Sequence, residues 1–160
     1  MIGDPSRLAR ILGYSFTHPD LLTQALTHRS SPGISNERLE FLGDALLGFV
    51  IAEALWELLP EADEGDLSRT RASLVKKEAL ARLARLIKLG DYLRLGPGES
   101  RTGAHGRDSI LEDALEAVFG AVFVDAGFEP AKALILKLFR EPLAEAVNQG
   151  QIKDPKTRLQ

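Results

Sequence analysis

Residues 36–45 read Asn36-Glu37-Arg38-Leu39-Glu40-Phe41-Leu42-Gly43-Asp44-Ala45, and they carry the strongest pattern in the chain. Three carboxylates fall at positions 37, 40 and 44, a spacing that places side chains on one face of an α-helix. The same face continues into Leu47, Gly48 and Ile51. Because a solvated helix face usually stays polar along its length, we expect these acids at the mouth of a buried region. Carboxylates held there need a cation, a proton or another partner.

A second acidic segment, residues 111–120, repeats this arrangement. Asp113 and Glu116 are three residues apart and share a helix face, which then turns apolar. Gly120 follows Glu116 by four residues, just as Gly48 follows Asp44. A glycine inside a helix costs roughly 1 kcal/mol relative to alanine, so we predict that the two helices cross closely at these glycines. That crossing would gather four acids: Glu40, Asp44, Asp113 and Glu116.

Four clustered carboxylates in a chain without cysteine form a site with oxygen ligands alone. Such ligands suit Mg²⁺, with Mn²⁺ as a substitute, and the matching reaction is metal-assisted hydrolysis of a phosphodiester. Acids on an ordinary solvated helix surface are the alternative. A di-iron site is disfavoured because it needs Glu-x-x-His, and the residues three before the histidines are Ser15, Ala25 and Thr102.

The remaining periodic segments predict an all-α fold, a helical bundle without strands. We expect the helix 37–59, apolar on nearly all sides, to be central and buried. Possible capping boxes start helices at Thr17–Asp20 and Ser109–Glu112. Residues 96–106 are expected to form a glycine-rich loop. The helices are expected at about residues 6–12, 20–27, 37–59, 67–87 (one or two helices), 109–125 and 130–147.

Length and composition suggest one domain in a reducing compartment. The chain has 160 residues, 44% of them hydrophobic, and no cysteine. No signal peptide is visible in the sequence, and the longest apolar runs, 45–52 and 117–124, are too short to cross a bilayer. We therefore expect a cytoplasmic protein without a membrane partner.

Basic residues concentrate in the middle of the chain. Residues 68–107 have a net charge of +7, whereas the remainder has −10. Such a middle could bind a polyanion, although a solvated helix face with a flexible loop would show the same charge. Nothing here resembles a nucleotide-binding fingerprint, because no strand or Gly-Lys-Ser/Thr accompanies Gly96-x-Gly98. The candidate contacts to an RNA duplex are Ser68, Arg69, Arg71, Arg101 and Arg107.

Five segments together resemble the ribonuclease III family, in the order that family carries them. The resemblance covers almost the whole chain. Besides residues 36–45, the segments are Leu26-Thr27-His28-Arg29-Ser30, Asp63-Glu64-Gly65-Asp66-Leu67-Ser68, Leu93-Arg94-Leu95-Gly96-Pro97-Gly98-Glu99 and Ser109-Ile110-Leu111-Glu112-Asp113-Ala114-Leu115-Glu116-Ala117.

The resemblance implies an all-α nuclease domain that works as a homodimer. One valley would hold two active centres, each cutting one strand of double-stranded RNA with Mg²⁺. The products would carry 5′-phosphates, 3′-hydroxyls and short 3′ overhangs. Family members act in this way on precursors of ribosomal, messenger and transfer RNAs.

The resemblance also assigns roles to individual residues. Asp44 and Glu116 match the catalytic carboxylates, and with Glu40 and Asp113 they match the metal ligands. Glu37 and Glu64 match further acids of the valley, linked to RNA handling or to metal. Phe41 matches an aromatic residue that packs into the partner subunit. From the residues alone, the alternative place for Phe41 is the core of its own domain.

The end of the chain departs from the family pattern. We assign residues 1–150 to the nuclease domain. We assign residues 151–160 to a linker or to the start of a double-stranded-RNA-binding domain, the rest of which this chain does not contain. The chain is either a shortened piece or an unusually short protein. Two other functions stay open: a non-catalytic RNA-binding or assembly scaffold of the same fold, and an unrelated acidic interaction domain. Retention of all four acids favours the nuclease.

Overall fold

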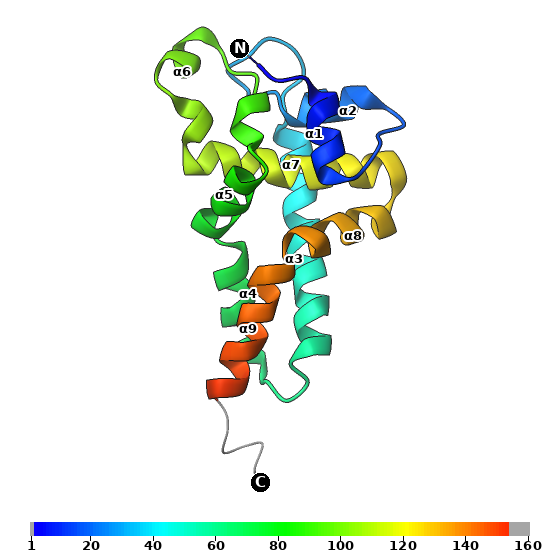
Figure 1. Ribbon diagram of the computed structural model, residues 1–160, viewed down its shortest axis with the longest axis vertical. Helices are drawn as coiled ribbons and strands as arrows, with labels where there is room; N and C mark the ends of the chain where they lie inside the picture. Colours follow the sequence, from blue (N-terminus) through cyan, green and yellow to red (C-terminus); the bar gives the residue numbers. More distant parts are fainter. Residues whose placement is uncertain (1, 154–160) are drawn as a thin grey trace.

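The computed structural model describes residues 2–153, and the regular structure in that range is helical apart from one parallel bridge between Thr27 and Arg94 (Figure 1). None of its helices is long and apolar enough to cross a membrane. This confirms the predicted all-α fold. The elements, with η marking short 3₁₀ helices, are α1 (Pro5–Leu12), α2 (Pro19–Ala25), α3 (Glu37–Leu58), α4 (Glu64–Val75), α5 (Lys77–Leu86), η1 (Leu89–Tyr92), α6 (Pro97–Arg101), η2 (Ala104–Gly106), α7 (Asp108–Ala126), α8 (Phe128–Leu138) and α9 (Arg140–Lys153).

Helix α7 forms the centre of the bundle. It packs against α2, α3, α5 and α8, and every residue from 114 to 122 is buried. The long helix α3 crosses it and extends well beyond it (Figure 1). The bundle therefore has the predicted buried central helix, but this helix is α7 and not the segment 37–59.

Helix α3 buries one face and exposes another. Leu47, Val50 and Ile51 are in the core, whereas Phe49 and Trp56 remain 57% and 74% exposed. A helix that is apolar on all sides is usually buried, but an exposed apolar face of this kind also marks a surface that a partner covers. Hydrophobicity alone does not separate these two cases, and for this reason it indicated the wrong helix as the central one.

The backbones of α3 and α7 touch at Gly43 and Gly120. A Cβ atom on Gly43 would lie 1.7 Å from the carbonyl oxygen of Glu116, and one on Gly120 would lie 2.3 Å from that of Leu39. The predicted crossing is therefore right for Gly120 and wrong for Gly48, because among residues 2–153 a Cβ placed there has no atom of a facing element within 4 Å. Gly48 is five residues beyond Gly43, roughly 140° around the helix, and so lies on a different face.

Two connections also differ from the expected pattern. Residues 96–106 contain the short helices α6 and η2 in place of an open loop. The single helix expected at 130–147 is broken at Phe139 into α8 and α9. Pro142 explains this break, since it has no N–H to donate within a continuous helix.

The start of α2 is attached to the end of α7 through Asp125. This carboxylate accepts hydrogen bonds from the Tyr14 hydroxyl (2.5 Å) and from the backbone N–H groups of Thr17 (2.8 Å) and His18 (2.9 Å). Burial alone would raise the pKa of Asp125, but these hydrogen bonds outweigh it and lower the pKa to about 2. The predicted capping box at Thr17–Asp20 is wrong, because the loop amides bond to Asp125 instead.

The capping box predicted at Ser109–Glu112 is wrong as well. Helix α7 already begins at Asp108, and its N-cap residue, Arg107, makes no side-chain capping bond.

Alanine substitutions distinguish the glycines at the contact from the one outside it. Gly43→Ala or Gly120→Ala is expected to lower the free energy of unfolding by about 3 kcal/mol or more, because backbone atoms of the facing helix must move. Gly48→Ala is expected to be neutral or to stabilise α3 by up to about 1 kcal/mol. Urea denaturation of the three variants measures this, and equal losses at all three positions would contradict the assigned contact.

Candidate active site

Three carboxylates from two helices converge where α3 crosses α7. One oxygen from each of Glu40, Asp113 and Glu116 lies within 4.8 Å of the others, so a single cation could bind all three. Gly43 follows Glu40 by three residues on α3, and its backbone lies against that of Glu116. The close glycine contact therefore sets the separation of the acids on the two helices.

Asp44, the fourth predicted acid, interacts directly with Glu116. Glu116 is buried, with only 4% of its surface exposed. Burial raises the pKa of Glu116 strongly, and the hydrogen bond and the negative charge of Asp44 raise it further. A cation bound between the two side chains would relieve this repulsion.

The other two acids of the cluster are also harder to ionise than usual. Burial and then the charge of Asp113 raise the pKa of Glu40. Burial likewise raises the pKa of Asp113, although Arg29 and, to a smaller extent, His28 oppose this. A metal ion would reverse all of these shifts, because it stabilises the ionised carboxylates that bind it.

Glu112 is a fifth acid at this site, and we did not predict it from the sequence. Burial raises its pKa, as do the charges of Asp113, Glu40 and Asp44, while Lys77 lowers it. Glu112 precedes Glu116 by four residues, so helical spacing alone puts both on one face of α7. That spacing was the signal that would have revealed it.

The exposed apolar face of α3 lies beside the acidic one. Phe41 is 78% exposed, so the structure excludes the domain's own core as its place. Phe49 and Trp56 are also exposed on the same helix. Helical spacing puts Phe41, Phe49 and Trp56 on one side of α3, within about a quarter of the circumference, and we call these three residues the aromatic face.

The residues predicted to contact RNA lie on several elements, and their role remains a prediction. Helices α4, α5 and α6 follow one another along one side of the molecule (Figure 1). On α4, Ser68 donates a hydrogen bond to Glu64 (2.5 Å), and Arg69 pairs with Asp66 (2.5 Å). Arg107 pairs with Glu99 (3.8 Å). The residues predicted to contact RNA are Glu37, Glu64, Ser68, Arg69, Arg71, Arg101 and Arg107.

Neutralising Glu116 is expected to stabilise the metal-free protein at high pH. Because folding raises the pKa of this acid, stability is full below the ordinary glutamate pKa and is lost as the pH rises towards the raised value. Glu116→Gln should therefore gain about 1 to 3 kcal/mol at pH 8 and little at pH 4. Urea denaturation in EDTA measures this, with Glu129→Gln on α8 as the control; a Glu116→Gln protein that is less stable at pH 8 would contradict it.

Comparisons with known proteins point to one family. A sequence profile of ribonuclease-III-like proteins matches residues 18–143. The ribonuclease 3 of Colwellia psychrerythraea is 58% identical over 155 residues, and that of Methylococcus capsulatus is 56% identical over 160 residues. These alignments cover 97% and 100% of this chain but 58% and 70% of the two relatives. The chain thus spans less than two thirds of the first relative.

A solved structure agrees with this result. The nuclease domain of ribonuclease III from Campylobacter jejuni superposes with a TM-score of 0.84 and is 42% identical in sequence. The superposition covers 87% of this chain and 98% of that domain, so the two share one fold. The Campylobacter structure shows flexibility in a region involved in dimer formation.

Proposed function

We propose that this chain, which belongs to the ribonuclease III family, hydrolyses phosphodiester bonds in double-stranded RNA. The observation that carries this proposal is the convergence of Glu40, Asp113 and Glu116 at the crossing of α3 and α7. Such a cluster destabilises a metal-free protein, because like charges repel and burial penalises them. A nuclease needs the cluster of acids to bind its cation, whereas a scaffold has no use for that cluster.

The chemistry of the ligands favours Mg²⁺, and Mn²⁺ could replace it. The site offers carboxylate oxygens only, which suit a hard cation with octahedral coordination. We assign Glu40, Asp44, Asp113 and Glu116 as the residues that hold it. Bound there, the cation would polarise the phosphate and stabilise the negative charge that develops during hydrolysis.

We assign Asp44 and Glu116 to the reaction itself. Burial raises the pKa of Glu116 most, and a hydrogen bond to Asp44 and its negative charge raise it further, so the two side chains are close neighbours. In the proposed reaction they orient a water molecule, whose oxygen bonds to phosphorus while the bond between phosphorus and the 3′-oxygen breaks. A proton from the water ends on that 3′-oxygen, so one product carries a 5′-phosphate and the other a 3′-hydroxyl. The RNA would be held by the exposed cations of α4 and of the segment around α6, the proposed roles of Arg69, Arg71, Arg101 and Arg107.

We also propose that two copies of the chain associate through the aromatic face. Phe41, Phe49 and Trp56 expose apolar surface beside the acids of α3, and aromatic residues are enriched in protein interfaces. A dimer built on this face would bring two active centres onto one duplex, each cutting one strand, and the products would carry short 3′ overhangs. The proposed setting is the cytoplasm, on precursors of ribosomal, messenger and transfer RNAs.

We propose residues 1–150 as the nuclease domain and the residues after them as a connection to an RNA-binding module. Helix α9 continues to Lys153, and residues 154–160 lie outside the described part of the chain. The full-length relatives are longer than this chain, and an additional module would add phosphate contacts, whose contribution to affinity is largest at low salt.

The first test is cleavage of a long perfect RNA duplex at low salt. The wild-type chain is expected to cut it in Mg²⁺ and not in EDTA, and Glu116→Gln should reduce the rate by about a thousandfold or more while retaining RNA binding. Glu129→Gln, which removes an exposed acid on α8, should cut normally. Binding without cutting by the wild type in both Mg²⁺ and Mn²⁺ would favour the scaffold alternative and refute the proposed activity.

The second test concerns association of the chain. Phe41→Glu places a charge in the proposed interface and is expected to weaken the dimer by about tenfold or more. Leu86→Glu, at another exposed apolar residue (74%) on α5, is the matched control and should associate normally. Sedimentation equilibrium measures both, and an unchanged dimer in Phe41→Glu would refute the assigned interface.

A further inference from the structure

The loop that follows α2 is held rigidly beside the active site. His28 donates its backbone N–H to the carbonyl of Arg94 (2.9 Å), and the backbone N–H of Gly96 donates to the Ser30 hydroxyl (2.9 Å). A Cβ on Gly96 would lie 2.3 Å from the carbonyl oxygen of Ser30, so the two segments are in backbone contact. Only glycine permits this approach, and residues 28–30 therefore have a fixed position relative to residues 94–96.

The ring of His28 is held by hydrogen bonds to Ser30. The backbone N–H of Ser30 donates to Nδ1 of His28 (3.1 Å), and the Ser30 hydroxyl lies 2.8 Å from the same nitrogen. Because that hydroxyl already accepts from Gly96, its own hydrogen is free to point at Nδ1. Nδ1 of His28 thus accepts from Ser30, and the ring braces the turn on which Arg29 lies.

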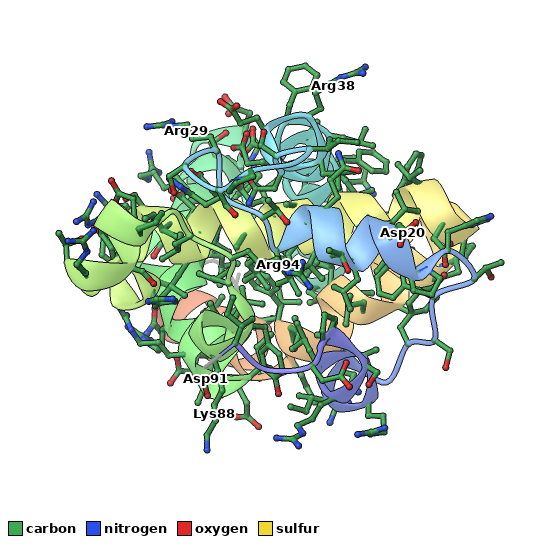
Figure 2. The ribbon with its side chains drawn as sticks, turned by 90° about the horizontal axis from the view of Figure 1, so that it is seen from above. Asp20, Arg29, Arg38, Lys88, Asp91 and Arg94 are labelled. Atoms are coloured by element: carbon green, nitrogen blue, oxygen red, sulfur yellow. The ribbon has the colours of Figure 1, made fainter. Side chains whose placement is uncertain are left out.

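Arg29 is an exposed cation next to the acidic cluster. It lies close enough to Asp113 for its positive charge to act on that carboxylate. Figure 2 shows the Arg29 side chain extending from this loop at the edge of a group of carboxylate oxygens. Within residues 2–153, no ion pair involves Arg29, whereas Arg69, Arg85 and Arg107 each pair with a carboxylate. Its guanidinium is thus available for another anion.

We propose that Arg29 binds a phosphate of the RNA strand at the active centre, adjacent to the bond that is cut. This inference rests on the proposed function. An RNA strand that reaches Glu40, Asp44, Asp113 and Glu116 meets a concentration of negative charge, and the bound cation neutralises only part of it. A guanidinium at the edge offsets the remaining repulsion and matches the geometry of phosphate oxygens, which an ammonium matches less well.

The rigid attachment of the loop strengthens this proposal. A mobile arginine would lose conformational entropy each time it bound phosphate. The hydrogen bonds between residues 94–96 and residues 28–30 already order the loop, so less conformational entropy is lost when Arg29 binds phosphate. Arg29 therefore acts as a positioned RNA contact of the active centre, in addition to the cations of α4 and the α6 segment.

The test measures binding of a perfect RNA duplex in EDTA, where no cutting intervenes, over a range of KCl concentrations. Arg29→Gln is expected to weaken binding about fivefold to tenfold near 0.1 M salt and to make the plot of log affinity against log salt shallower by about one per lost contact. Arg29→Lys should recover most of the slope but only part of the affinity. Lys88→Gln is the matched control, because Lys88 is exposed on the opposite side of the molecule (Figure 2).

The outcomes separate this proposal from the proposed function. A wild type that binds and cuts RNA, together with an Arg29→Gln protein of unchanged affinity and salt slope, would overturn the role of Arg29 and leave the nuclease standing. A wild type that neither binds nor cuts would overturn both. A purely structural effect of the substitution would lower the active fraction and the melting temperature without changing the slope, and that result would also overturn the proposal.

Discussion

The backbone contact between Gly43 and Gly120 determines where every acid of the site lies. It brings α3 and α7 closer than any side chain would allow, with a Cβ at Gly43 only 1.7 Å from a backbone oxygen. Glu40 and Asp44 are within one turn of Gly43, and Glu116 is one turn before Gly120. The distances among the carboxylates therefore follow from two residues that have no side chains, and the rest of the bundle supports this crossing.

Without a cation, the cluster of acids destabilises the fold that positions it. Burial raises the pKa of Glu40, Glu112, Asp113 and Glu116, and repulsion from neighbouring acids adds to this for Glu40, Glu112 and Glu116, so each acid is costly to ionise without a cation. At the other end of α7, Asp125 is satisfied by hydrogen bonds and has a pKa of about 2. One helix thus carries a stabilising carboxylate at one end and destabilising ones at the other. Binding of a cation would convert that cost into affinity for the metal.

Helical spacing was enough to predict much of this protein, and the errors have physical causes. The helices around 37–58 and 108–126 are long and periodic, so the sequence alone was enough to group their acids. Spacing did not show which glycine on α3 faces α7, because Gly43 and Gly48 are equally unusual in a helix. Apolar character alone did not show that Phe41 is exposed. The break before α9 required attention to Pro142, whose missing N–H outweighs the periodicity around it.

The most direct test of the metal site at this crossing is crystallographic, with Mn²⁺ in the crystals and its anomalous scattering used to locate the metal. We expect a peak about 2.2 Å from carboxylate oxygens of Glu40, Asp113 and Glu116, near Asp44, and no such peak in Glu116→Gln crystals. Retention of that peak in the Glu116→Gln protein, or a wild-type peak only at other carboxylates, would contradict the claim that the crossing of α3 and α7 builds the catalytic metal site.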